Sequence, residues 1–145
     1  MTRPMILALV VHGLLLALLG MALGFPLHRA IVSDGSPAVQ LAWRSSHTTL
    51  VTGGTFYVAL AAVGHHLVLG RWAARVATGT WVAASYAFAA VLTCGPALGA
   101  RGLEPVGPSS HVAVHVGFLL AIALLFTGAG IFTWGAIVAF ARSRS

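Results

Sequence analysis

Seven histidines stand in a chain of 145 residues that is 59% hydrophobic and only 7% charged. Polar side chains at bilayer depth are costly and tend to be functional, and neutral imidazole is the commonest metal ligand in proteins. The histidines form two layers along the expected helices, with His28, His47, His111 and His115 near one end and His12, His65 and His66 toward the other. The chemistry that they favour is ligation of a metal or of a metal-containing cofactor.

His47 is the strongest candidate ligand, because two serines and two threonines flank it within an otherwise apolar region. His111 and His115 are four residues apart and share a helix face, so they can bind one ion jointly, or one can ligate while the other donates a hydrogen bond. His12 lies about one third of the way along its helix. For the histidines nearest the interfaces, a solvated or snorkelling role is the competing interpretation.

Other catalytic constellations are missing from the sequence. The two acidic residues, Asp34 and Glu104, fall in predicted loops and cannot act as a paired acid and base. There is no GxSxG motif and no phosphate-binding glycine loop. The single cysteine, Cys94, excludes an intrachain disulfide. A bound metal or cofactor must therefore carry any difficult chemistry.

Four long apolar segments must position these histidines. Each exceeds the roughly 20 residues that a helix needs to cross a bilayer, and together they occupy residues of about 5–27, 41–69, 72–93 and 111–141. We expect Pro26 to lie near the end of the first helix and Cys94-Gly95-Pro96 to close the third. The sequence predicts an all-α integral membrane protein, with residues 1–145 forming one domain of four transmembrane helices in an up-down bundle.

The distribution of arginine predicts the orientation of this bundle. The formal charge is +6, but the arginines are scattered singly at the ends of apolar segments, which argues against a nucleic-acid partner. Five of them (Arg3, Arg71, Arg75, Arg142 and Arg144) fall on the side of the termini, and three (Arg29, Arg44 and Arg101) fall on the other. Because cytoplasmic flanks retain positive charge, we expect both termini to lie in the cytoplasm. We expect the protein to reside in the inner (plasma) membrane of the cell.

Small residues predict where helices approach one another. Gly20 and Gly24 form a GxxxG motif, and Gly53 and Gly54 thin the middle of the second helix. Association in lipid depends on close backbone contact, which glycine permits. These faces serve contacts within one chain or between protomers, and four helices leave little room for an enclosed internal cavity. We therefore expect an oligomer.

The chain also resembles a known family at several short motifs. These are His12-Gly13, Gly35-Ser36-Pro37, the group Trp43, Arg44 and His47, and Arg101-Gly102-Leu103. In their order and spacing they resemble the styrene oxide isomerases, which are small four-helix membrane enzymes that convert aryl epoxides to aldehydes.

The resemblance implies a homotrimer that binds heme b between neighbouring protomers, with His47 as the axial ligand of the iron. The ferric heme would act as a Lewis acid that binds the oxygen of a small hydrophobic epoxide and promotes its opening to a benzylic cation. A 1,2-hydride shift would then give the aldehyde with no net redox change. The remaining candidate cofactor contacts are His12, Gly53, Gly54, His111 and His115.

Two positions depart from the family pattern. The family has an asparagine six residues after the axial histidine, where this chain has Gly53, and its tyrosine of the third helix aligns with Leu92. Thr52 is the nearest hydrogen-bond donor to the first position. For the second position the alternatives are Tyr86, six residues earlier, and Tyr57 on the second helix. We take Thr52 and Tyr86 as the candidate catalytic residues. Because of these two departures, the substrate or the isomerase activity itself can differ from that of the family.

Two other functions stay open. The histidine layers suit a membrane cytochrome that transfers electrons through bis-histidine heme, which would have no open iron position for a substrate. A non-enzymatic accessory subunit or channel-like bundle, whose histidines relay protons or bind copper or zinc, would be colourless after purification.

Overall fold

The computed structural model describes residues 1–100 and 104–144. The motif Arg101-Gly102-Leu103 therefore lies outside the described residues. The described chain is helical throughout, and its elements in order are α1 (Arg3–Ala22), α2 (Gly24–Val32), α3 (Pro37–Val63), the 3-10 helix η1 (Gly64–His66), α4 (Arg71–Ala97) and α5 (Ser109–Arg142).

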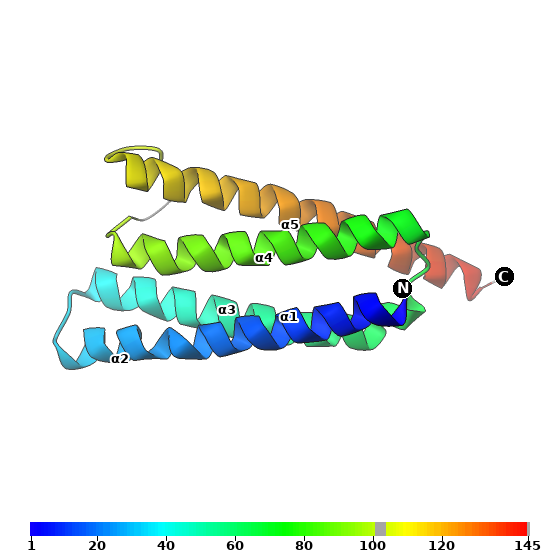
Figure 1. Cartoon of the computed structure of the whole chain (residues 1–145), viewed down its shortest axis with the longest axis horizontal. Coiled ribbons are helices and arrows are strands. Elements are labelled where there is room, and N and C mark those ends of the chain that lie inside the picture. The colour runs from blue at the N-terminus through cyan, green and yellow to red at the C-terminus, as the bar shows by residue number, and fades with distance from the viewer. Residues whose placement is uncertain (101–103, 145) are drawn as a thin grey trace.

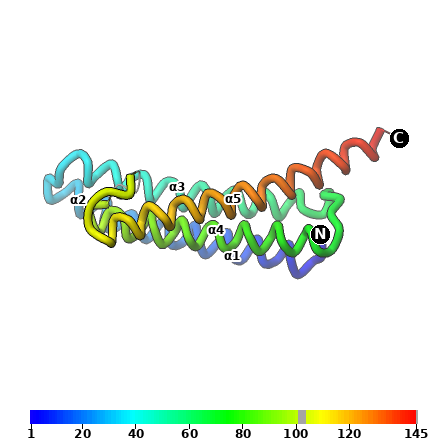
Figure 2. The backbone as a smooth tube through the Cα atoms, turned by 90° about the horizontal axis from the view of Figure 1, so that it is seen from above, coloured from blue at the N-terminus to red at the C-terminus, as the bar shows by residue number. Residues whose placement is uncertain are grey.

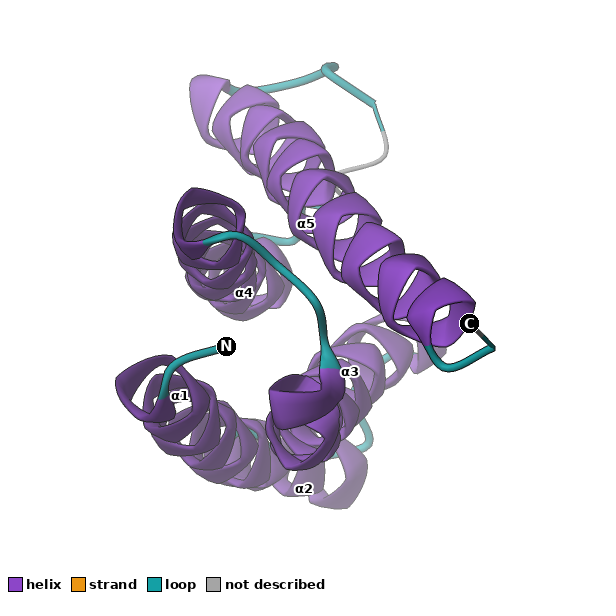
Figure 3. Ribbon diagram, turned by 90° about the vertical axis from the view of Figure 1, so that its right-hand side faces the viewer, coloured by secondary structure: helices purple, strands orange, loops and turns teal. Residues whose placement is uncertain are grey.

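The helices form four antiparallel legs, as the up-down prediction requires (Figure 1). α2 continues the direction of α1, so the two together make the first leg, and both termini lie at the same end of the bundle. α1 packs along α3 and α4 packs along α5, while contacts between these two pairs are narrower (Figure 3). The C-terminal end of α5 extends beyond the other helices (Figure 2).

Glycines bring α1 into backbone contact with α3. A Cβ atom on Gly13 would lie 2.8 Å from the Gly54 carbonyl oxygen, and one on Gly20 would lie 2.6 Å from the backbone nitrogen of Val51. Because any larger residue would push the helices apart, these positions support the expected role of small residues in helix packing.

The first leg is longer than predicted. Pro26 does not mark the end of the helix, since α2 continues to Val32. Proline instead breaks the leg internally at Leu23, because its ring clashes with the carbonyl four residues earlier, that of Ala22. Pro26 itself lies in the first turn of α2, where its missing N–H costs nothing.

The second leg begins and ends earlier than predicted. α3 starts at Pro37 rather than near Leu41, because proline fits the first turn of a helix. It ends at Val63 rather than Leu69, and η1 carries the chain to His66 before an extended link leads to α4. The backbone N–H of Val68 in this link donates to the Gly135 carbonyl of α5.

The third leg passes through a proline that was expected to end it. α4 continues to Ala97 and contains Pro96, which cannot donate to the carbonyl of Leu92 one turn earlier. The Ser46 hydroxyl of α3 donates to that carbonyl instead, at 2.6 Å. A side chain from the neighbouring helix therefore satisfies the acceptor that Pro96 leaves open.

Three of the described helical stretches are long and apolar enough to cross a membrane, namely Arg3–Val32, Arg71–Ala97 and Ser109–Arg142. Large apolar side chains such as Phe25 and Trp72 point outward from them and are 80% and 75% exposed. The remaining leg, α3, carries the polar stretch around His47, and its Thr48 and Thr55 hydroxyls bond backbone carbonyls one turn earlier. The chain is therefore a multi-pass membrane protein.

Candidate functional site

His47 lies on α3 beside the point where α1 gives way to α2. Its ring is half-buried, and Nδ1 lies 2.8 Å from the carbonyl oxygen of Gly20. A carbonyl only accepts, so Nδ1 carries the proton and donates it. In the neutral ring, Nε2 then keeps its lone pair, which is the form that binds a metal.

The local backbone explains this arrangement. Gly20 belongs to the last turn of α1, and the carbonyls of a final helical turn have no partner within their own helix. Gly24 lies across the break, and a Cβ atom there would sit 3.6 Å from Nδ1 of His47, which is ordinary contact. The GxxxG motif thus serves two purposes, since Gly20 packs against α3 and Gly24 lies beside the histidine ring.

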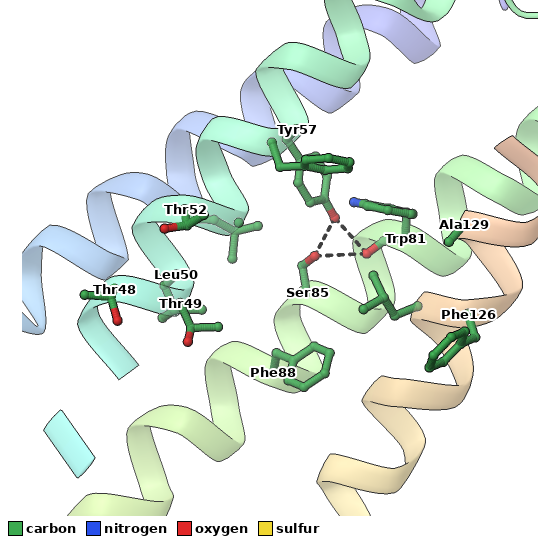
Figure 4. Close-up of a pocket in the computed structure, with 14 residues that line it drawn as sticks. Thr48, Thr49, Leu50, Thr52, Tyr57, Trp81, Ser85, Phe88, Phe126 and Ala129 are labelled. Atoms are coloured by element: carbon green, nitrogen blue, oxygen red, sulfur yellow. Dashed lines mark hydrogen bonds between the residues drawn. The ribbon is translucent and has the colours of Figure 1, made fainter. Parts of the chain in front are cut away.

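A cavity of about 650 Å³ opens on a different side of α3 (Figure 4). Positions 47 and 53 are separated by about 120° around the helix, and His47 does not line this cavity. Aromatic rings dominate its wall. The lining includes Phe56 and Tyr57 of α3, Trp81 and Phe88 of α4, and Phe126 of α5. The size falls within the range of small-molecule pockets.

One corner of this cavity is polar. The Tyr57 side chain is 2% exposed, and its hydroxyl donates to the Trp81 carbonyl at 2.7 Å. The Ser85 hydroxyl lies 2.7 Å from the Tyr57 oxygen and 3.1 Å from the Trp81 carbonyl oxygen, so the three oxygens form the triangle drawn in Figure 4. Thr49 and Thr52 line the cavity from α3. Polar groups in so apolar a wall orient a ligand.

The two neighbouring glycines of α3 have different environments. A Cβ atom on Gly54 would lie 2.5 Å from the Gly13 carbonyl oxygen, so Gly54 is a packing residue between α1 and α3. A Cβ atom on Gly53 would meet nothing within 4 Å, and Gly53 lines the cavity. Gly53 therefore leaves room for a ligand at this point of the cavity wall.

His12 and Tyr86 form a separate polar pair. Nδ1 of His12 lies 2.9 Å from the Tyr86 hydroxyl, which joins α1 to α4. Tyr86 is 41% exposed and neither residue lines the cavity. The structure thus places the two candidate catalytic residues apart, with Thr52 at the cavity and Tyr86 on another face of α4. Leu92 lines a second cavity of about 590 Å³, nearer the loops.

The other histidines are distributed over the ends of the bundle. Nε2 of His111 lies 3.3 Å from the Leu98 carbonyl oxygen, and His115 is half-buried one turn further along α5. His28 is exposed, as are His65 and His66, whose ring centroids are 3.8 Å apart. Within residues 1–100 and 104–144, no three histidine, cysteine or acidic side chains come together as a metal site. A metal held by this chain would depend on few protein ligands, as heme iron does.

Sequence reasoning missed the polar corner of the cavity. Tyr57 and Ser85 are 28 residues apart on different helices, and a serine within an apolar helix commonly bonds only its own backbone. The one available signal was that Ser85 and Trp81 share a helix face, being four residues apart. The sequence offered Tyr57 only as an alternative to Tyr86, and it did not indicate that Tyr57 contacts Ser85.

Comparison with known proteins gives one match. The family model described as SOI, styrene oxide isomerase, matches residues 6–140 of the chain. No curated protein and no solved structure gives a significant match. The match covers all four legs of the bundle and includes both His47 and the cavity-lining residues.

Proposed function

Because the chain belongs to the styrene oxide isomerase family, we propose that it is a heme b-dependent membrane isomerase that opens a hydrophobic aryl epoxide to an aldehyde. Family membership implies isomerase activity. The cofactor, the mechanism and the substrate are the parts that we propose. The proposal rests on one observation above all, the hydrogen bond between His47 and the Gly20 carbonyl.

That hydrogen bond makes His47 fit the role of axial ligand. A metal-binding histidine ordinarily donates its other ring nitrogen to a carbonyl or carboxylate, which fixes the tautomer and the ring orientation. Here Gly20 accepts from Nδ1, and Nε2 is left as the ligating atom. Ferric heme would supply a Lewis-acidic iron, which polarises an epoxide C–O bond without needing protein carboxylates. The described chain offers no acid–base pair that could replace it.

The cavity fits the substrate's part of this proposal. Its aromatic wall would bind an aryl group and exclude water, which would otherwise convert the opened epoxide to a diol. Thr52 lies at the wall and is our candidate for a substrate contact. We assign Tyr86 a supporting role, since its hydroxyl is bonded to His12. His12, His111, His115 and Gly53 remain candidate neighbours of the cofactor, whereas Gly54, also a candidate from the sequence, faces α1 and packs against Gly13.

The separation of His47 from the cavity supports an oligomer. Within one protomer the histidine does not line the cavity, so a single chain does not combine a heme ligand with this binding space. A neighbouring copy that brings its own cavity to His47 would complete the site. The homotrimer implied by the family resemblance would supply such a neighbouring copy.

Visible spectroscopy of the purified protein tests the proposal. We expect a Soret band in the wild-type protein, a ferric spectrum that changes on addition of cyanide, and turnover of styrene oxide to phenylacetaldehyde. His47→Ala should lose the Soret band and reduce turnover at least 100-fold, in line with removal of the ligand that holds a catalytic metal. His28→Ala is the matched control, because His28 is exposed near the same end of the bundle and should keep both properties.

Three outcomes would contradict the proposal. Heme that does not respond to cyanide would favour the bis-histidine electron carrier. A colourless protein after expression with sufficient heme would favour the accessory or channel-like bundle. Full heme content in His47→Ala would show that another residue is the ligand.

A further inference from the structure

In the polar corner of the cavity, the Trp81 carbonyl already has two hydrogen-bond donors without the hydroxyl of Ser85. The Trp81 carbonyl has two lone pairs, and as an interior carbonyl of α4 it already accepts the backbone N–H of Ser85. The Tyr57 hydroxyl donates to the same carbonyl at 2.7 Å. These two donors occupy both lone pairs of the carbonyl oxygen. The Ser85 hydroxyl, at 3.1 Å, is a third and weaker donor to the same oxygen.

The proton of Ser85 is therefore the one that can be redirected. It can point to the Tyr57 oxygen at 2.7 Å, or it can turn toward a ligand in the cavity that Ser85 lines. When it turns, the Trp81 carbonyl keeps its other two donors, and the Tyr57 hydroxyl loses Ser85 as a donor but stays bonded to Trp81 through its own proton. The cost of presenting this donor to a ligand is small.

A second donor lies beside it. The Trp81 side chain is 8% exposed, and its indole N–H has no hydrogen-bond partner among the described residues. The Tyr57 and Trp81 rings pack edge to face with centroids 6.1 Å apart, and in Figure 4 the indole nitrogen lies on the same side as the two hydroxyls. The indole nitrogen is not among the fully buried unpaired atoms of the described chain, so this N–H is accessible to a ligand that would supply an acceptor.

We propose that Ser85, assisted by the Trp81 indole N–H, binds the oxygen atom of an otherwise apolar aryl ligand in this cavity. The corner presents donors and the rest of the wall is mainly aromatic and aliphatic, so the ligand class is an aryl molecule with one accepting oxygen, such as an epoxide or a carbonyl compound. The inference rests on the proposed function in taking the epoxide as the natural ligand. It gives Ser85 a binding role in the cavity that Gly53 also lines without a side chain.

Binding of two matched probes tests this assignment without requiring turnover. Acetophenone and α-methylstyrene have the same shape, but the first carries a carbonyl oxygen where the second carries a methylene group. Their dissociation constants would be measured by calorimetry for the detergent-purified full chain. Comparison between variants cancels the partition of each probe into detergent. Ser85→Ala should weaken acetophenone by roughly 3- to 10-fold, the effect of losing one hydrogen bond, and leave α-methylstyrene unchanged.

Further variants distinguish the loss of the Ser85 hydroxyl from a general change in the fold. Ser85→Thr keeps a hydroxyl and should keep the preference for acetophenone. Thr93→Ala removes another α4 hydroxyl, which bonds the Ala89 carbonyl outside the cavity, and should change neither affinity. Equal weakening of both probes in Ser85→Ala, selective weakening in Thr52→Val instead, or no binding of acetophenone to the wild type would overturn the proposal. Selective binding by a protein without heme would refute the proposed function but leave this assignment standing.

Discussion

Single glycines determine how α1 meets α3, and this contact determines where the His47 ring lies. Gly20 does two things at once, since its missing side chain admits the backbone of Val51 and its carbonyl accepts from His47. At Gly24, one turn later, a Cβ atom would make only ordinary van der Waals contact with the same ring. A methyl group added at Gly20 would therefore clash with α3, whereas one added at Gly24 would fit.

We predict that Gly20→Ala destabilises the protein and Gly24→Ala does not. The added methyl group at Gly20 would lie 2.6 Å from the backbone nitrogen of Val51, which cannot move out of the way as a side chain can. Overpacking of this kind costs about 1–3 kcal/mol. Unfolding of the detergent-solubilised variants by SDS, followed by circular dichroism, measures the difference.

Gly24→Ala is the control because its methyl group would make contact at 3.6 Å and alanine favours a helix over glycine. The two variants should also differ in heme content, since displacement of α1 removes the acceptor of the His47 proton. Equal stability of both variants would show that α1 does not depend on Gly20 for its approach to α3.

Residue identity alone predicted part of the site. The polar neighbours of His47 marked it as the candidate ligand, but its partner, Gly20, belongs to a different helix and was visible only as a packing residue. Likewise, His12 and Tyr86 are 74 residues apart and meet through the narrow contact between α1 and α4. Such pairings depend on helix packing and rotation, which one sequence does not specify.

At the scale of helices, prolines account for most of the differences between expected and observed boundaries. Pro37 begins α3, Pro26 interrupts the first leg, and Pro96 lies inside α4. The pattern of long segments correctly indicated four helical legs, although α3 is less apolar than the other three. The effect of Pro96 was not predictable in the same way, since Ser46 on another helix compensates for it.

We predict that the effects of Ser46→Ala and Pro96→Ala are coupled. Ser46→Ala alone leaves the Leu92 carbonyl without a donor and should cost about 1 kcal/mol, a typical value for a hydrogen bond between membrane helices. Pro96→Ala restores a backbone N–H to that carbonyl. In the Pro96→Ala background, removal of Ser46 should therefore cost less.

A double-mutant cycle of unfolding free energies measures this coupling. Thr48→Ala supplies the comparison, because its hydroxyl bonds only carbonyls of its own helix and it should not couple to Pro96. Additive effects of Ser46→Ala and Pro96→Ala would show that the contact between Ser46 and Leu92 does not replace the missing helix bond.

At the scale of the whole molecule, the bundle has two ends of different charge. Arg3, Arg71, Arg75, Arg142 and Arg144 lie toward the end that carries both termini, and Arg29 and Arg44 lie toward the other. Arg101 lies outside the described residues. We propose that the end richer in arginine faces the cytoplasm, as the positive-inside rule predicts.

We predict that a cysteine at the α2–α3 turn is accessible from outside the cell membrane and that one at the C-terminus is not. The positions are Ser36→Cys and Ser143→Cys, each in a Cys94→Ala background because Cys94 is exposed. Both serines are exposed at opposite ends of the bundle. A membrane-impermeant maleimide should label the first in intact spheroplasts and the second only after lysis. The reverse pattern would invert the proposed orientation.

The polar character of α3 has a consequence for how the protein enters the membrane. Of the four legs, α3 alone is not among the helices that are apolar enough to span the bilayer by themselves. A translocon sorts each emerging segment by its hydrophobicity, so α3 would partition poorly if it entered alone. The first leg is synthesised before it, and the glycine-lined face of α1 is already available when α3 leaves the ribosome. The contact that orients His47 in the finished protein would then also retain the helix that carries His47 in the lipid phase during biogenesis.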